Sequence, residues 1–381
     1  MTLLDRLTTS DPTTGALNCG LCAHRCALRA GQAGLCGAIV NQDGRLRSLA
    51  DGRPVVLHPD PVERKPLYHV LPGANLLSLG ALGCNMTCDF CQNWRISQAR
   101  PAHEGPLTPP AAVVAAALEQ GCAGIAFTYN EPTIYLDYAA TIMALAQRAG
   151  LISVFKSNGY LTPEAIAALA SQFPPPSASP TGEGEVYPGH QSASPRSGSR
   201  SEREQGARTV SDRSATLLNA INVDLKGFDD GYYRKVCGAR LQHVLEAIEQ
   251  LRRRGVWVEV TTLIIPGVND SDGELRALTA WLASLSPDIP WHVWRFHPDY
   301  RMADVAWTHA RDVERAIAIG RAAGLRYVYA SNLPGDPSQH TRCPGCGATL
   351  IERVGNATTA VRMEAGQCPA CGWTLPGWWG R

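Results

Sequence analysis

The sequence lacks several features that would place the protein in a familiar class. Its 35 lysines and arginines almost balance its 34 acidic residues, so no overall charge favours nucleic acid or an acidic membrane surface. No apolar run reaches the length of a membrane span, and the opening MTLLDRLTTSDPTTG has no basic-then-apolar signal pattern. We therefore expect a cytoplasmic protein with neither a membrane nor a nucleic acid as its partner.

Large apolar residues are missing from one internal stretch. Residues 174–214 contain no Leu, Ile, Met, Phe or Trp, and are instead rich in Ser, Pro, Gly and charged residues. Such a segment cannot bury enough apolar area to offset the entropy lost on ordering. We expect a disordered insertion here; the alternative is an arginine-containing tail that touches RNA or a partner.

The rest of the chain alternates strand-like and helical patterns. The strand-like runs lie at 76–82, 124–130, 151–155, 220–227, 256–265, 291–296 and 326–331. Helical patterns occupy 109–119, 135–150, 163–170, 241–254, 273–285 and 310–323. This alternation predicts an α/β fold with a parallel sheet, as a barrel or an open partial barrel.

Cysteine is plentiful, with 13 residues in the chain, and most of it is grouped. In a cytoplasmic protein such groups indicate metal or redox chemistry rather than disulfides. Only Cys122 and Cys237 stand alone, and packing is the favoured interpretation for both.

Three cysteines lie in the stretch GCNMTCDFCQNW, directly after the first strand-like run. Cys84, Cys88 and Cys91 have the spacing C-x3-C-x2-C, with Phe90 just before the last. Three thiolates leave one iron of a [4Fe–4S] cube open to a substrate or cofactor. The alternative is a three-cysteine zinc site completed by a distant ligand.

Polar residues recur where the later strand-like runs end, which in a parallel barrel is the end that carries the chemistry. They include Asn130 and Glu131, with Pro132 beside them, then Asn158, the pair Asp224 and Lys226, and His297. Taken singly, Asn158 could belong to an ordinary turn and His297 to the surface.

The cysteine spacing, the aromatic residue and the YNEPT stretch (129–133) resemble the radical S-adenosylmethionine (SAM) superfamily. That resemblance implies a partial (β/α)6 barrel in which Cys84, Cys88 and Cys91 hold a [4Fe–4S] cluster. It also implies that Glu131 accepts the SAM amino group, that Phe90, Asn130, Pro132 and Asn158 complete the cofactor site, and that Asp224, Lys226 and His297 face cofactor or substrate.

The motifs DPVERKPLYHVLPG (60–73), INVDLKGF, TTLIIPGVND, RFHPDYRM and GQCPACGWTLPGWW resemble the radical SAM enzymes of the AmmeMemoRadiSam system. These enzymes are relatives of the pyruvate formate-lyase activating enzymes. The resemblance implies reductive cleavage of SAM to a 5′-deoxyadenosyl radical, which abstracts hydrogen from an unidentified substrate. Implied partners are a flavodoxin- or ferredoxin-like electron donor and a protein substrate or partner of that system.

Two other functions stay open. One is a glycyl-radical activating enzyme, although Lys156 stands where those activating enzymes carry an acidic residue. The other belongs to a different class, a non-catalytic zinc protein that binds RNA or protein.

The tail carries two CP-x-CG knuckles, which contain Cys343, Cys346, Cys368 and Cys371. This pattern predicts a zinc-ribbon-like segment over 336–381, with rubredoxin-like iron or no metal as alternatives. The nearby Trp373, Trp378 and Trp379 either dock a partner or pack the ribbon onto the barrel; we expect packing for at least one.

A Cys-rich extension over 1–75 precedes the barrel of 76–335. It contains Cys19, Cys22, Cys26 and Cys36, which could hold zinc or an auxiliary iron–sulfur cluster, since spacing alone does not separate the two. A structural metal is the favoured interpretation, and an arm with reduced thiols is the alternative.

Overall fold

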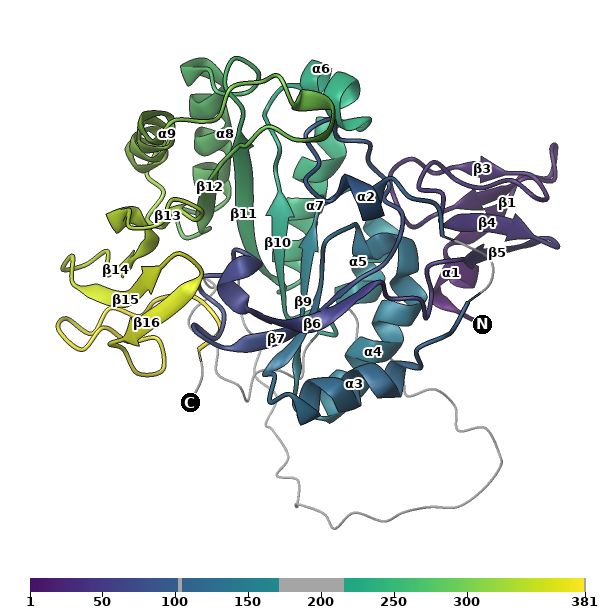
Figure 1. Cartoon of the computed structure of the whole chain (residues 1–381), viewed down its shortest axis with the longest axis horizontal. Coiled ribbons are helices and arrows are strands. Elements are labelled where there is room, and N and C mark those ends of the chain that lie inside the picture. Colours follow the sequence, from purple (N-terminus) through teal and green to yellow (C-terminus); the bar gives the residue numbers. More distant parts are fainter. Residues whose placement is uncertain (102–104, 171–215, 380–381) are drawn as a thin grey trace, which may run out of the picture.

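The structure is a computed structural model, which describes residues 1–101, 105–170 and 216–379. The predicted insertion at 174–214 lies outside the described residues. Figure 1 shows a central barrel flanked by two smaller segments, one formed by the first residues and one by the last.

The centre of the molecule is an eight-stranded sheet in the order β13-β12-β11-β10-β9-β8-β7-β6. Its strands are β6 (Val56–Pro61), β7 (Asn75–Gly80), β8 (Gly124–Phe127), β9 (Ile152–Ser157), β10 (Ala220–Asp224), β11 (Trp257–Ile264), β12 (Trp291–Arg295) and β13 (Val328–Ala330). Neighbours from β7 to β13 pair in parallel, and these strands are mostly buried, as expected for a sheet covered on both faces.

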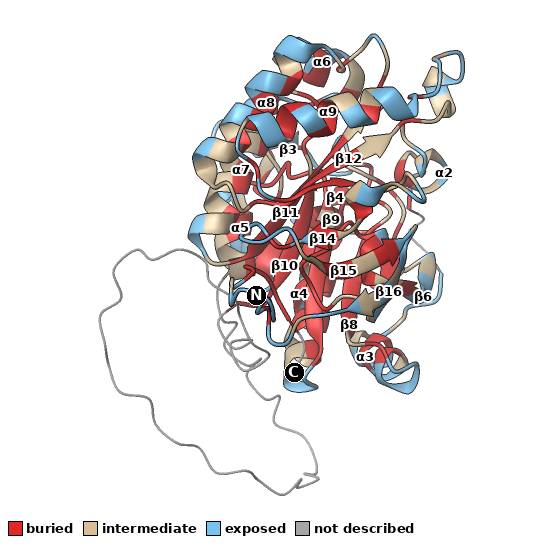
Figure 2. Cartoon of the chain, turned by 90° about the vertical axis from the view of Figure 1, so that its left-hand side faces the viewer, coloured by how far each residue is buried: buried red, intermediate tan, exposed pale blue. Residues whose placement is uncertain are grey.

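Helices follow the parallel strands and cover the outside of the sheet (Figure 2). They are α2 (Trp94–Ser97), α3 (Pro110–Glu119), α4 (Leu136–Arg148), α5 (Pro163–Ala170), α6 (Asp230–Tyr232), α7 (Leu241–Arg253), α8 (Asp272–Leu285) and α9 (Ala310–Ala322). Six strand–helix units therefore precede β13, which confirms the predicted partial (β/α)6 barrel.

An antiparallel strand that the sequence analysis did not expect, β6, forms one edge of the sheet. It pairs with β7 from Val56 opposite Gly80 to Pro61 opposite Asn75. Pro59 and Pro61 have no N–H to donate, which suits an edge strand. Because β6 lies within 1–75, part of the N-terminal extension is built into the barrel sheet.

The chain after β6 closes the end of the barrel where the parallel strands begin. Residues 66–71 follow the 3-10 turn η1 (Val62–Arg64) and contact the buried Glu259 of β11. The Glu259 carboxylate accepts hydrogen bonds from the backbone N–H of Tyr68 (2.9 Å) and of His69 (2.8 Å). It also accepts from Trp257 Nε1 (3.0 Å) and from His292 Nε2 (2.7 Å). The barrel is therefore plugged at this end, and ligands must enter from the other.

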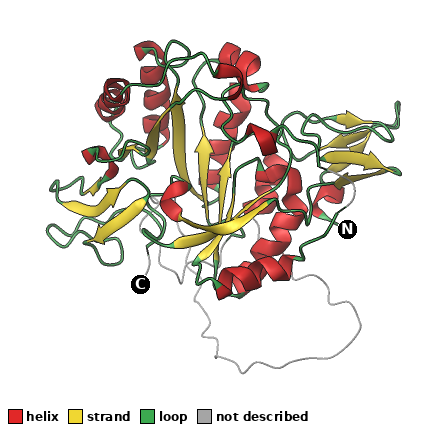
Figure 3. Cartoon of the chain, in the orientation of Figure 1, coloured by secondary structure: helices red, strands yellow, loops and turns green. Residues whose placement is uncertain are grey.

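The two flanking segments consist of short strands joined by loops (Figure 3). The first contains α1 (Leu3–Arg6), β1 (Thr8–Ser10), β2 (Leu17–Cys19), β3 (Ala27–Leu28), β4 (Ile39–Gln42) and β5 (Arg45–Ser48). The second contains η6 (Pro337–Gln339) and a sheet of β14 (Thr341–Arg342), β15 (Thr349–Val354) and β16 (Ala357–Val361).

The C-terminal segment packs firmly against the barrel. Trp378 forms a β-bridge with Val70, in the segment 66–71 that plugs the barrel. Trp379 joins a buried cluster that includes Tyr327 and Tyr329 around β13. The buried Arg353 donates a 2.7 Å hydrogen bond to the Tyr68 carbonyl. Trp378 and Trp379 therefore pack the ribbon onto the barrel, as the sequence analysis expected for at least one of the three tryptophans.

Candidate active site

A cavity of about 360 Å³ opens at the carboxyl ends of the barrel strands. The ends of five consecutive strands, β8 to β12, contribute to its wall through Thr128, Lys156, Asp224, Leu263 and Trp294. The loop between β7 and α2 adds Cys84, Cys88 and Cys91, which are the only cysteines among the lining residues of the described chain. The predicted three-cysteine loop thus faces the predicted strand ends.

Backbone contacts hold this cysteine loop from several sides. The N–H groups of Thr87 and Asp89 donate to the carbonyls of Cys237 and Val236, both at 3.0 Å. The side chain of Asn130 donates to the Gly83 carbonyl (2.8 Å) and accepts from the Ala81 N–H (3.1 Å). The loop is therefore fixed by β7, by the turn after β8 and by the π-helical turn η4 (Tyr233–Cys237).

The three sulfurs have unequal surroundings. Burial raises the pKa of Cys84 and of Cys91, although Ser97 Oγ lies 3.2 Å from the Cys91 sulfur. The pKa of Cys88 is lowered instead, first by a hydrogen bond from the Cys237 thiol and then, against the effect of burial, by the Lys226 ammonium.

The spacing of these thiols differs from that of a single-ion site. A tetrahedral zinc with bonds of about 2.3 Å places its sulfurs about 3.8 Å apart. Within the described ranges, no group of three or more potential ligands that includes Cys84, Cys88 or Cys91 has all its ligand atoms within 4.8 Å. Three thiols spread along one cavity wall fit a cluster in which each cysteine binds its own iron.

Glu131 lies on the same wall but is already engaged. Its carboxylate accepts from Thr133 Oγ1 (2.6 Å), from Ser157 Oγ (2.9 Å) and from the Asn158 N–H (2.8 Å). Burial raises the pKa of Glu131, and these hydrogen bonds oppose that shift. Pro132 is buried in the 3-10 turn η2 (Pro132–Tyr135) and shapes the turn without lining the cavity.

Asn158 and Phe90, two further predicted residues, line the cavity beside the cysteine loop. Asn158 lines the cavity, and its Nδ2 donates to Asn85 Oδ1 at 2.7 Å, which ties the end of β9 to the loop. The Phe90 ring also lines the cavity, lies parallel to the Tyr232 ring at 6.5 Å, and has the Lys226 ammonium 5.6 Å from its centroid.

Asp224 lies between two lysines on the cavity wall. Lys156 Nζ donates to Asp224 Oδ1, and Lys226 Nζ lies 3.3 Å from Asp224 Oδ2. Burial alone would raise the pKa of Asp224, but the two ammonium groups lower it. Burial lowers the pKa of Lys156; it acts the same way on Lys226, whose pKa is nevertheless raised by Asp224 and Cys88. One carboxylate between two lysines leaves this patch cationic.

His297 is not brought to the cavity. Its ring lies tilted against the Trp307 ring, with 5.5 Å between their centroids, and its Nδ1 lies 3.4 Å from the Pro298 carbonyl. Residues that the sequence analysis did not single out line the wall instead, among them Tyr129, Asn332 and Asn356. Tyr129 has a φ of 69°, an uncommon conformation for a residue with a side chain, and this outlier was not visible in the sequence. Asn356 comes from the hairpin tip between β15 and β16, so the ribbon forms part of the cavity.

Cys237 is a second residue whose position the sequence did not reveal. It was interpreted as a packing residue, and it is fully buried, but its thiol also lowers the pKa of Cys88. Lys156 was noted only as a departure from the activating enzymes, and it proves to be a partner of Asp224.

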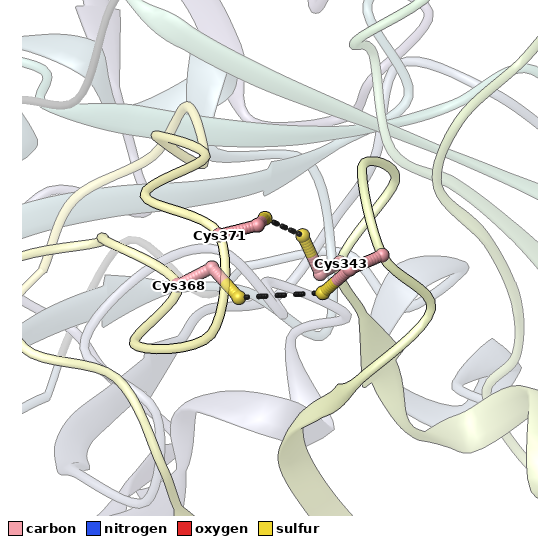
Figure 4. Close-up of side chains that lie close together, drawn as sticks. Cys343, Cys368 and Cys371 are labelled. Carbon is pink, nitrogen blue, oxygen red and sulfur yellow. Dashed lines mark hydrogen bonds between the residues drawn. The ribbon is translucent and has the colours of Figure 1, made fainter.

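The four C-terminal cysteines form a compact group. Cys343 Sγ lies 3.5 Å from Cys371 Sγ, and Cys346 Sγ lies 3.7 Å from Cys368 Sγ (Figure 4). Burial would raise the pKa of Cys368, but the N–H groups of Ala370 and Cys371 lower it to about 7. These spacings match a tetrahedral single-ion site, as zinc prefers.

The four N-terminal cysteines lie together as well. One small cavity, between the N-terminal segment and η2 on the outside of the barrel, is lined by Cys19, Cys22, Cys26 and Cys36.

Among the described helices, none has the length and apolar character needed to cross a membrane.

Comparison with known proteins gives one relative along nearly the whole chain. The chain is 34% identical over 361 residues to the uncharacterized protein MJ0808 of Methanocaldococcus jannaschii, covering 93% of this chain and 94% of the relative. It is also 31% identical over 94 residues to the isethionate sulfite-lyase activating enzyme of Nitratidesulfovibrio vulgaris, covering 23% of this chain and 31% of that enzyme. The family model of the radical SAM superfamily matches residues 80–175 and 208–278.

Solved structures with a similar fold include a radical SAM methyltransferase from Sphaerobacter thermophilus. It is 15% identical with a TM-score of 0.46, over 68% of this chain and 66% of that one. A domain of a pyruvate-formate lyase-activating enzyme from Bacteroides vulgatus is 14% identical with a TM-score of 0.37, over 54% of this chain and 97% of that domain.

Proposed function

The chain is a radical SAM protein of one family with the Methanocaldococcus jannaschii relative, and on this premise we propose that it is an enzyme of the AmmeMemoRadiSam type that cleaves SAM reductively. When bound, a [4Fe–4S] cluster supplies the electron that splits the sulfonium bond of SAM into methionine and a 5′-deoxyadenosyl radical, which then takes hydrogen from the substrate. The observation that carries the proposal is the cavity wall with three cysteines facing the ends of five strands.

The protein's own groups serve to bind and orient the reactants. Cys84, Cys88 and Cys91 would hold the cluster at the wall, and the cavity side would keep room for SAM. Both oxygens of Glu131 already accept hydrogen bonds, so we assign it to fixing the turn after β8 and to attracting the SAM ammonium by charge. The plug at the other end of the barrel restricts the approach of water to the radical.

The cationic patch around Asp224 favours an anionic group in the bound molecules. Lys156 and Lys226 carry two positive charges against the single charge of Asp224. Arg64 and Lys65 line the same cavity, where both pair with Asp60. We propose that a carboxylate of SAM or of the substrate binds here. We further propose that the electron comes from a flavodoxin- or ferredoxin-like protein, and that the enzyme acts with a protein substrate or partner of the same system.

Formation of 5′-deoxyadenosine tests the proposal. The protein is reconstituted anaerobically with iron and sulfide, reduced with dithionite, mixed with SAM, and its products are separated by chromatography. Cys88→Ala should abolish 5′-deoxyadenosine, whereas the control Cys122→Ala, a buried cysteine away from the cavity, should retain it. Unchanged 5′-deoxyadenosine in Cys88→Ala would contradict the assignment of the site.

A glycyl-radical activating enzyme is the second candidate, because one partial relative carries that name. Lys156 in place of the acidic residue of those enzymes argues against it. A glycyl radical detected by electron paramagnetic resonance (EPR) on a co-purifying partner would favour this candidate. A chain that stays colourless after anaerobic addition of iron and sulfide would instead favour the non-catalytic zinc protein.

A further inference from the structure

The cavity around the N-terminal cysteines is built like a ligand shell. Apolar side chains of Leu21, Leu28, Ile39 and Ile134 surround Cys19, Cys22, Cys26 and Cys36. Gly34 lies between two of the sulfurs, since a Cβ there would be 3.7 Å from Cys26 Sγ and from Cys36 Sγ. The backbone at Gly34 therefore lies beside both thiols.

A backbone N–H group points at one of the four sulfurs. The Ile39 N–H donates to Cys36 Sγ at 3.4 Å. Such a bond stabilises a thiolate, the form in which cysteine binds metal. A reduced arm with no ligand would gain little from this arrangement.

The spacing separates the two metal classes that the sequence left open. Over the residues that the structure describes, no three of these four cysteines have sulfurs all within 4.8 Å, whereas the C-terminal four do. Both sets have four cysteines in the same chain, so the C-terminal set is an internal reference for a single ion. A cube spreads its four thiolates over four irons, and therefore suits the wider arrangement.

This shell touches the cysteine loop of the barrel. His24 Nε2 lies 2.7 Å from the Asn85 carbonyl, next to Cys84. The Cys36 carbonyl packs against Gly83, where a Cβ would come within 2.8 Å of it. Cys22 pairs with Leu161 in the loop that follows Asn158. One layer of backbone thus separates the two cysteine sets.

We propose that Cys19, Cys22, Cys26 and Cys36 bind a second [4Fe–4S] cluster, fully ligated by protein and in contact with the loop that holds the first. Full ligation makes this cluster an electron carrier rather than a SAM site, and its apolar shell keeps solvent away. This inference concerns a different set of ligands from the proposed active site, so the two can fail separately.

Counting iron and acid-labile sulfide in the reconstituted full chain tests the inference. Wild type should hold about eight of each, and the variant Cys84→Ala/Cys88→Ala/Cys91→Ala about four of each. The variant Cys19→Ala/Cys22→Ala/Cys26→Ala should also keep about four, with Cys122→Ala as the unchanged control. Zinc in place of iron and sulfide in the barrel variant would overturn the inference, and the sulfide count distinguishes a cluster from a lone iron.

EPR spectroscopy of the reduced wild type decides the matter if a triple variant does not fold. Two clusters in contact should give a spectrum broadened by spin coupling, in which SAM alters only one component. A single, fully SAM-sensitive signal with about four irons per chain would mean that the N-terminal cysteines hold no cluster. If instead SAM alters nothing while two clusters are counted, the proposed active site fails and the second cluster stands.

Discussion

Replacing Glu259 by glutamine tests how the barrel end is closed. Glu259 is fully buried, and each of its oxygens accepts two hydrogen bonds. The amide group of glutamine must replace one oxygen. The amide NH2 is best tolerated in place of the oxygen that faces His292. The His292 ring can change its tautomer, so that Nε2 accepts a hydrogen bond from the amide instead of donating one. The Tyr68 N–H on the same side then has no acceptor.

One unpaired buried N–H costs about 1–3 kcal/mol in the free energy of unfolding. For a chain of this size that should lower the melting temperature by roughly 2–6 °C. The pKa of Glu259 is lowered in the fold, where burial opposes but His292 and His69 prevail. Its ionisation therefore stabilises the fold above the ordinary glutamate pKa, and this stabilisation is lost as the pH falls through the folded value.

Thermal melting of the reconstituted protein at neutral and acidic pH measures both effects. The control Glu246→Gln changes a half-exposed residue of α7 and should leave the melting temperature unchanged. The difference between wild type and Glu259→Gln should shrink as the pH becomes acidic. A variant that melts with wild type at neutral pH would refute the role of Glu259 in holding residues 66–71.

Three other predictions concern the metal sites. Cys343→Ser should release the C-terminal metal and increase hydrogen exchange over residues 341–379 while the barrel strands stay protected; unchanged exchange would argue against a structural metal. Cys237→Ala removes the thiol that lowers the pKa of Cys88, so the iron content should hold but the reduction potential of the cavity cluster should fall in a redox titration. An unchanged potential would mean that the Cys237 thiol does not act on Cys88 in the holoprotein. Asn130→Ala removes both bonds to the cysteine loop and should lower cluster occupancy, and full iron content would show that the loop is held without it.

The barrel was predictable from sequence because its strands and helices are long and regular. Buried parallel strands appear as continuous apolar runs, and each was separated from the next by a helical pattern. The edge strand β6 was missed because Pro59 and Pro61 weaken its strand signal. The register of the sheet could not be predicted either: Lys156 pairs with Asn222 across β9 and β10, and its ammonium reaches Asp224.

The site was predictable where its residues form local motifs and not where the fold joins distant segments. The cysteine loop and the turn after β8 lie within short stretches that could be interpreted directly. Cys237 and Asn356 reach the site from the π-helical turn η4 and from the ribbon hairpin, and no local pattern indicated either. His297 follows its strand as the pattern predicted, but its ring turns toward Trp307.

The most direct test of the account is electron–nuclear double resonance on the reduced protein with SAM labelled in its amino nitrogen or carboxylate oxygen. Three thiolates at the cavity should leave one iron to bind these groups, so the labels should show hyperfine coupling to the cluster. Absence of coupling, with a spectrum that SAM does not change, would contradict it.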